Sequence, residues 1–259
     1  MRVLLTIAAL CTAATAATAR ADYPVAPDVV VFCEPTLRVL IVDLGAQWRK
    51  ETGIPLRVFA APTWANLQQL ARHARDDVMI GEGDAAAASA AGQDLINGET
   101  LLRLWRNHLV VAALTGELRK ARARSPPAAF DLAAIAGRAP VAIVDPGVAQ
   151  TGKDGERALR AVGMWAAVSA KSIGVVDTAD AAFLLSEGGV ELAVLYASDA
   201  ALHRDFTVTD TLPDADPPTV YWAAQTARAM SPNAAKFLDF LRRPDVRARG
   251  LDAGLEVLP

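Results

Sequence analysis

The segment VVVFCEPTLR, residues 29–38, joins a continuous apolar run to an abrupt polar junction. VVVFC is β-branched and apolar throughout, which is typical of a strand in a parallel sheet covered on both faces. After the junction of Glu34, Pro35 and Thr36, apolar residues recur at helical spacing until Gly53 provides a stop signal. The segment therefore predicts a strand that runs directly into a helix, which is where open α/β sheets hold ligands.

The rest of the chain repeats this alternation of strands and helices. Further strands are predicted at 54–60, 77–81, 108–114, 140–145, 191–196 and 219–225, with helices between and after them. Two such βαβ series predict an α/β protein of two lobes, each a mostly parallel sheet flanked by helices. We expect lobe 1 to combine residues 22–106 with 224–259 and lobe 2 to be 107–223, with a ligand cleft between the lobes and the crossings as a hinge.

Residues 1–21 have the features of a cleaved secretory signal peptide. A cationic start at Arg2 precedes an apolar run of small residues, and Ala19 and Ala21 fit the −3 and −1 positions of a cleavage site. No later segment reaches about 18 uninterrupted apolar residues, so no membrane span is expected after cleavage.

The composition disfavours several classes of function. The net charge of −3 gives no basis for nucleic-acid binding. Of the two cysteines, Cys11 lies in the signal peptide, so Cys33 remains alone and no intramolecular disulfide is expected. The three histidines are scattered, and no nucleophile motif surrounds Cys33. We therefore expect neither an enzyme nor a resident cofactor, and the sequence leaves any metal ligands unknown.

Four predicted helices begin at a threonine that follows a strand: Thr36, Thr63, Thr151 and Thr178. Each hydroxyl could simply cap its helix. Together, however, they meet at the carboxyl edges of the sheets, where helix N-termini can bind an anion without Lys or Arg. Tyr196, at the end of a strand, could add a phenolic donor to the same cleft.

From Val29 onward the chain resembles the periplasmic molybdate-binding proteins of bacterial ABC importers, within the type II periplasmic solute-binding superfamily. The segments that carry the resemblance are AIVDPGVAQTGKDGERAL, LLSEGGVELAVLYASDA, PNAAKFLDFLRRPDVRARG, WRKETGIPLRVFAA and DDVMIG. The resemblance implies an oxyanion held by the hydroxyls of Thr36 and Thr63, by backbone N–H groups of Thr151 and Thr178, and by the hydroxyl of Tyr196.

The function implied by the resemblance is that of a periplasmic substrate-binding protein. It would capture a small ligand of the molybdate or tungstate type between its lobes and deliver it to an ABC permease and ATPase complex. We expect a monomer with one cleft per chain.

The loops that would touch the ligand depart from the family pattern. Cys33 and Glu34 replace small residues, Trp64 enters the second loop, Glu82 ends the third strand, and Lys153 follows Gly152. An ionised Glu34 within about 4 Å of a dianion would be repelled by several kcal/mol.

These departures leave several readings open. An oxyanion requires Glu34 to point away, to be protonated or to be paired with Lys153. Alternatively, the same scaffold binds a small organic molecule or metal species through Cys33, Glu34 and Trp64. A third possibility is a periplasmic metal chaperone or sensor that meets no permease.

Overall fold

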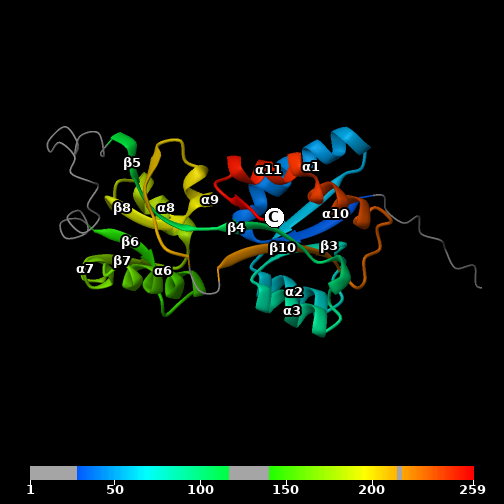
Figure 1. Cartoon of the computed structure of the whole chain (residues 1–259), viewed down its shortest axis with the longest axis horizontal. Coiled ribbons are helices and arrows are strands. Elements are labelled where there is room, and N and C mark those ends of the chain that lie inside the picture. Colours follow the sequence, from blue (N-terminus) through cyan, green and yellow to red (C-terminus); the bar gives the residue numbers. More distant parts are fainter. Residues whose placement is uncertain (1–27, 117–139, 215–217) are drawn as a thin grey trace, which may run out of the picture.

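The computed structural model describes residues 28–116, 140–214 and 218–259. The chain forms two lobes that lie side by side, each built on one β-sheet (Figure 1). The predicted signal peptide lies outside the described residues. Within them, no helix has the length and apolar character needed to cross a membrane.

The sheet of the first lobe has the strand order β11-β4-β10-β3-β1-β2. Its strands are β1 (Val29–Cys33), β2 (Leu56–Ala60), β3 (Val78–Glu82), β4 (Leu102–Asn107), β10 (Thr219–Gln225) and β11 (Glu256–Val257). The helices on one face are α1 (Arg38–Thr52), α10 (Ala234–Arg242) and α11 (Pro244–Asp252), and those on the other are α2 (Thr63–Ala71) and α3 (Asp84–Gly92) (Figure 1). The short 3₁₀ helices η1 (Pro35–Leu37) and η2 (Gly98–Thr100) precede α1 and β4.

Strand β1 explains why both faces are covered. Val29, Val31 and Cys33 belong to the core under α1 and α10, whereas Val30 and Phe32 belong to the core under α2 and α3. Because successive side chains of a strand point to opposite faces, a continuous apolar run needs helices on both sides. The predicted strand-to-helix junction is present, with η1 directly after Glu34.

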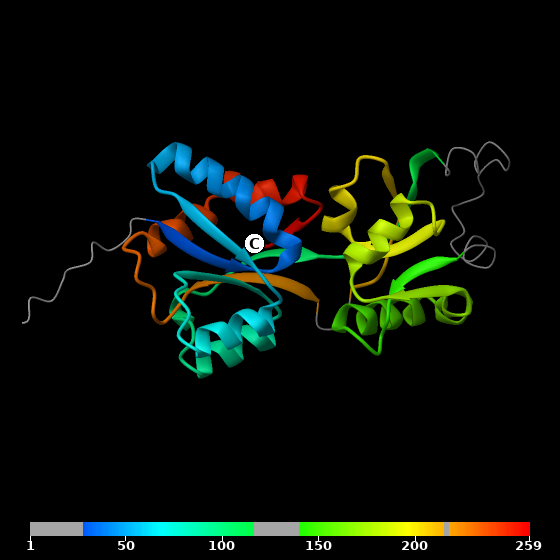
Figure 2. The ribbon, with the colours of Figure 1, turned by 180° about the vertical axis from the view of Figure 1, so that it is seen from behind.

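The sheet of the second lobe has the order β7-β6-β8-β5-β9. Its strands are β5 (Leu109–Leu114), β6 (Val141–Val144), β7 (Ser172–Val175), β8 (Leu192–Tyr196) and β9 (Phe206–Thr211). Helices α6 (Gln150–Ala161) and α7 (Trp165–Ser169) pack on one face, and α8 (Thr178–Ser186) and α9 (Ala197–Ala201) pack on the other. Viewed from behind, the chain passes from β4 directly into β5, joining the lobes (Figure 2).

The predicted two-lobe α/β fold is confirmed, but the sheets are mixed rather than mostly parallel. In the first lobe β1 pairs in parallel with β2 and β3, whereas β10 runs antiparallel to β3 and β4. In the second lobe β6 is parallel to β7 and β8, and β5 is antiparallel to β8 and β9. The antiparallel pairs involve the strands that connect the lobes. The chain leaves the first lobe through β4 and β5 and returns to it through β9 and β10.

The second crossing lies earlier than the sequence indicated. A boundary between residues 223 and 224 would cut β10, which pairs with β3 and β4 in the first sheet. The described chain therefore leaves the second lobe after β9 and re-enters the first lobe by Thr219. The apolar pattern of TVYWAAQ identified a strand but carried no information about which sheet contains it.

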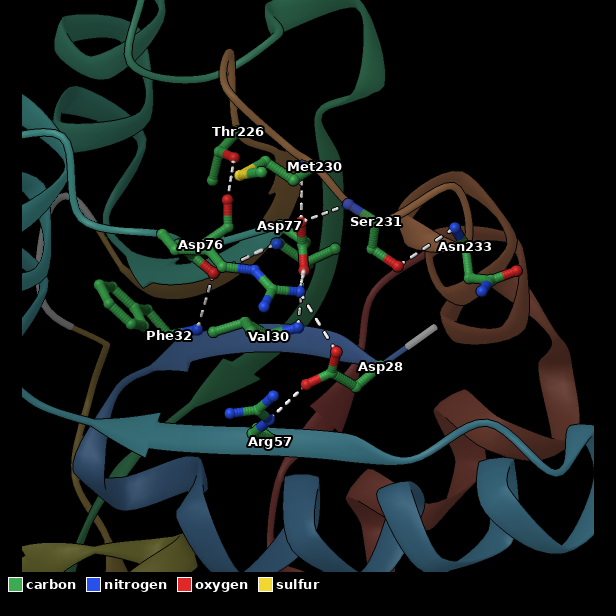
Figure 3. Close-up of polar contacts among 12 residues, drawn as sticks. Asp28, Val30, Phe32, Arg57, Asp76, Asp77, Thr226, Met230, Ser231 and Asn233 are labelled. Carbon is green, nitrogen blue, oxygen red and sulfur yellow. Dashed lines mark hydrogen bonds and ion pairs between the residues drawn. The ribbon is translucent and has the colours of Figure 1, made fainter. Parts of the chain in front are cut away.

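A network of buried carboxylates holds the first lobe together at the strand ends away from the junctions (Figure 3). The Asp77 side chain is fully buried and accepts backbone N–H groups from Val30 at 2.9 Å and from Met230 and Ser231 at 2.8 Å each. Its neighbour Asp76 accepts the N–H of Phe32 at 3.3 Å. This network ties β1 to the start of β3 and to the loop that leads into α10.

Candidate ligand-binding site

A cleft of about 930 Å³ lies between the lobes and is lined by residues of both. The lining residues from the first lobe are Glu34, Pro35, Thr36, Pro62, Thr63, Trp64, Leu67, Glu82, Ala86 and Ser89. Those from the second lobe are Val148, Ala149, Thr151, Val176, Asp177, Thr178, Ala179, Tyr196, Asp199 and Leu202. The five predicted donors, four threonines and one tyrosine, are thus brought together at a single cleft.

On the first-lobe side, the N-terminus of α2 is already occupied by a side chain of the protein. The buried Glu34 carboxylate accepts both the backbone N–H and the hydroxyl of Thr63. The Thr63 hydroxyl oxygen in turn accepts the N–H of Glu82 at 2.8 Å. Thr63 therefore lines the cleft with both of its donors directed at Glu34 rather than at the cleft space.

The acidic side chains on the first-lobe side of the cleft have raised pKa values. Burial raises the pKa of Glu34, although its hydrogen bonds from Thr63 act in the opposite direction. Burial, with the charges of Glu34 and Asp154 nearby, raises the pKa of Glu82 to about 8. Glu82 therefore keeps its proton at neutral pH unless a positive charge approaches it.

Thr36 contributes to a polar chain that crosses between the lobes. Its hydroxyl lies 3.0 Å from the Tyr221 hydroxyl, which also accepts the side-chain amide of Asn107 at 3.0 Å. Asn107 ends β4, and its amide also donates to the Ser198 hydroxyl of the second lobe at 2.9 Å. The junction after β1 is in this way connected to the first crossing.

On the second-lobe side, Thr151 and Tyr196 face each other with their hydroxyl oxygens 3.3 Å apart. Burial, with the charge of Glu82, raises the pKa of Tyr196 well above its ordinary value, so the phenol stays protonated as a donor. The start of α6 approaches the end of β6 closely: a Cβ at Gly152 would lie 2.5 Å from the Asp145 carbonyl oxygen. A larger residue in this first turn of α6 would force the backbone after β6 to shift.

Two carboxylates that the sequence did not point to lie near the start of α8: Asp177 is its N-cap, and Asp199 belongs to α9. Asp177 accepts the N–H of Asp180 at 2.9 Å and caps the helix. Asp199 is 9% exposed and hydrogen-bonds to Thr178, and burial raises its pKa to about 6. Its Oδ2 atom has no hydrogen-bond partner among the described residues. In the sequence, Asp177 directly precedes the predicted donor Thr178 and Asp199 follows Tyr196 by three residues, which was the signal available.

Of the three residues considered as altered contacts, Glu34 and Trp64 line the cleft and Cys33 does not. Trp64 is 66% exposed in the cleft wall. Cys33 is fully buried in the first-lobe core, and burial raises its thiol pKa to about 12. The apolar β1 run places this side chain beneath α1, so a ligand contact through Cys33 is wrong for this structure.

The charged side chains found among the described lining residues of the cleft are all acidic. Among its described lining residues are Glu34, Glu82, Asp177 and Asp199, and none is Lys or Arg. Lys153 is exposed outside that lining, and no contact between Glu34 and Lys153 is found in the described part of the chain. The described residues also contain no group of three or more His, Cys, Asp or Glu side chains able to hold a metal ion.

A two-lobe α/β chain whose strand-to-helix junctions surround one interlobe cleft has the architecture of a solute-binding protein. The family comparison agrees with the architecture. Residues 29–256 match the model for bacterial extracellular solute-binding proteins, and the chain belongs to this family. The search of curated proteins gave no match.

Solved structures share the fold at low sequence identity. The substrate binding domain assigned to a molybdenum ABC transporter from Clostridium difficile has a TM-score of 0.73 and 17% identity, covering 90% of this chain and 99% of that one. The periplasmic molybdate-binding protein of Azotobacter vinelandii gives 0.69 and 18%, with 90% and 100% covered. Iron-bound HitA from Pseudomonas aeruginosa gives 0.60 and 12%, with 90% and 86% covered.

Proposed function

We propose that the protein is the periplasmic substrate-binding component of an ABC importer, which captures a small ligand between its lobes. The observation that carries this proposal is the convergence of the strand-to-helix junctions of both lobes on one cleft of about 930 Å³. That volume lies within the usual range for sites of small organic ligands. Membership of the solute-binding family supports the transport role.

The proposed mechanism is closure of the lobes about the two crossings. Thr36 on one side and Thr151 with Tyr196 on the other would meet the ligand, and the permease would recognise the closed form. Near the crossings, His108 lies 2.7 Å from an Asp214 oxygen and 3.0 Å from a Glu256 oxygen. These contacts connect both crossings to the C-terminal strand, so the hinge side stays joined while the cleft side moves.

Two ligand classes have support. The hydroxyl donors and the two molybdenum-related structural neighbours favour a tetrahedral oxyanion of the molybdate or tungstate type. The carboxylates of the lining favour a positively charged ligand. The hypothesis of a metal chaperone or sensor has no structural support, because the described residues include no cluster of metal-ligating side chains.

The proposal is tested with the mature protein, beginning at residue 22, by thermal shift and small-angle scattering. The probes are molybdate, tungstate, sulfate, phosphate, Cu(II), Zn(II) and a set of small amines. A ligand at a hundredfold excess over its Kd should add about 2.7 kcal/mol of stability and reduce the radius of gyration. The double variant Thr151→Val, Tyr196→Phe should lose both effects. Binding that persists in this variant without compaction would place the ligand outside the cleft and refute the proposal.

A further inference from the structure

The ligand's charge can be inferred from how the helix starts of the cleft are used. An oxyanion is normally held by free N–H groups at helix N-termini. Here the start of α2 donates to Glu34, and the start of α8 donates to Asp177. The protein's own carboxylates thus occupy two of the helix starts at the cleft, where they would repel an oxyanion, whereas the start of α6 has no side-chain cap.

A second observation concerns a buried carboxylate among the residues that line the cleft. Asp199 is nine-tenths buried at the cleft, and its Oδ2 atom has no hydrogen-bond donor among the described residues. A buried carboxylate oxygen without a donor is unfavourable and therefore uncommon. The oxygen itself is closed off from solvent, so a positively charged ligand in the cleft would stabilise it through its electrostatic field, whereas an anion would not.

The wall of the cleft indicates an organic ligand rather than a bare ion. Trp64 presents a largely exposed indole to the cleft, and the lining also includes the apolar side chains of Leu67, Val148, Val176 and Leu202. An indole face attracts organic ammonium groups, and apolar walls bind a carbon skeleton. The described residues provide no cluster of metal-ligating side chains.

We infer that the cleft binds a small organic cation, with its ammonium group between Glu82 of the first lobe and Asp199 of the second and its apolar body against Trp64. Glu34 acts as a specificity determinant that keeps anions from the start of α2. The inference rests on the proposed function, whose cleft it uses, and it specifies the ligand class of that cleft.

The test uses two cationic probes with neutral counterparts of matched shape. Choline is compared with 3,3-dimethylbutanol, and putrescine with 1,4-butanediol, by isothermal titration calorimetry of the mature protein at pH 8.5. We expect at least one cation to bind and its neutral counterpart to bind at least a hundredfold more weakly. Glu82→Gln and Asp199→Asn should each weaken binding at least tenfold. Asp84→Asn, which removes an exposed carboxylate outside the cleft lining, should leave it unchanged.

The pH dependence adds a readout that a purely structural role would not give. Choline carries a permanent charge, so any change in its affinity reports on the protein. Because the pKa values of Asp199 and Glu82 are raised to about 6 and about 8, choline affinity should rise from pH 5 to pH 9. Circular dichroism melting curves of each variant show whether weaker binding reflects misfolding, since the isosteric substitutions should keep the wild-type fold.

The outcomes separate this inference from the proposed function. Binding of molybdate or tungstate, with no binding of choline or putrescine, would overturn the cation inference and support the importer proposal. Failure of both cations would overturn the inference regardless of the anions. Equal cation affinity in wild type, Glu82→Gln and Asp199→Asn would overturn the assignment of the two carboxylates. If no probe of either charge binds, the cleft proposal fails as well.

Discussion

Replacing Asp77 by Asn should strongly destabilise the first lobe while leaving its shape almost unchanged. One Asp77 oxygen accepts the N–H groups of Met230 and Ser231, and the other accepts that of Val30 (Figure 3). In the variant, an amide NH₂ must face one of these donors. Hydrogen bonds to a charged group contribute about 1.5–3 kcal/mol each, and a buried donor without a partner costs about 1–3 kcal/mol.

The expected loss is about 3–5 kcal/mol, because two bonds lose their charge assistance and one N–H loses its acceptor. This is a large part of the roughly 5–15 kcal/mol by which typical domains are stable. Urea unfolding followed by tryptophan fluorescence measures it, since Trp105 and Trp222 are buried in this lobe. With a slope of about 3 kcal/mol/M, the midpoint should fall by more than about 1 M.

The matched control is Asp84→Asn, which also removes one negative charge. Asp84 pairs with Arg103 at 2.9 Å, but the two side chains are 48% and 59% exposed. Such a surface pair contributes about 0–1 kcal/mol. If Asp77→Asn unfolds within 1 kcal/mol of the control, the buried network does not hold the lobe and the reasoning is refuted.

Three further predictions concern the cleft. Gly152→Ala should lower the free energy of unfolding by about 1–3 kcal/mol and weaken ligand binding, because its Cβ would overlap the Asp145 carbonyl. The control Gly155→Ala, whose Cβ would meet no atom closer than 3.9 Å, should leave the melting curve of the protein unchanged. The free energy of unfolding of the wild type should fall as pH rises from about 4.5 to 8, because folded Glu82 holds a proton that the unfolded chain loses. In Glu82→Gln, urea titrations should show a smaller change of this free energy with pH. Glu34→Ala should free the Thr63 donors, so that molybdate or sulfate binds. Calorimetry measures this binding, and its absence in the variant would show that Glu34 does not exclude anions.

The sequence predicted the positions of the helix starts because those signals are local. A β-branched run followed by Pro-Thr specifies a strand, a turn and a helix start within a few residues. Thr36 and Thr63 follow a proline in this way, and Thr151 and Thr178 follow Gln150 and Asp177 at other strand-to-helix junctions. Parallel strands bring their carboxyl ends to one edge of a sheet. Their meeting at one cleft therefore follows from the alternation of elements.

The direction of the side chains could not be predicted from the same signals. Glu34 and Thr63 are separated by 29 residues, and only the pairing of β1 with β2 brings them together. The same limit applies to Cys33, whose burial depends on β1 being covered by α1 as well as by α2. The membership of β10 in the first sheet depends on where the chain returns from the second lobe, which no local pattern encodes.

The resemblance to molybdate-binding proteins and the charge of the cleft are compatible, because fold and ligand are specified by different atoms. The fold needs helix starts with their N–H groups directed toward one cleft, and this backbone arrangement survives any side chain that can satisfy those groups. Glu34 accepts the N–H of Thr63 at the start of α2, and Asp177 accepts that of Asp180 in the first turn of α8. Once internal carboxylates take the place of a ligand anion, the attraction of each helix terminus is largely cancelled. The remaining acids then favour a cation: Asp199, and Glu82 once an approaching positive charge displaces its proton. A few substitutions at helix starts can thus reverse the charge preference of the cleft without altering the lobes.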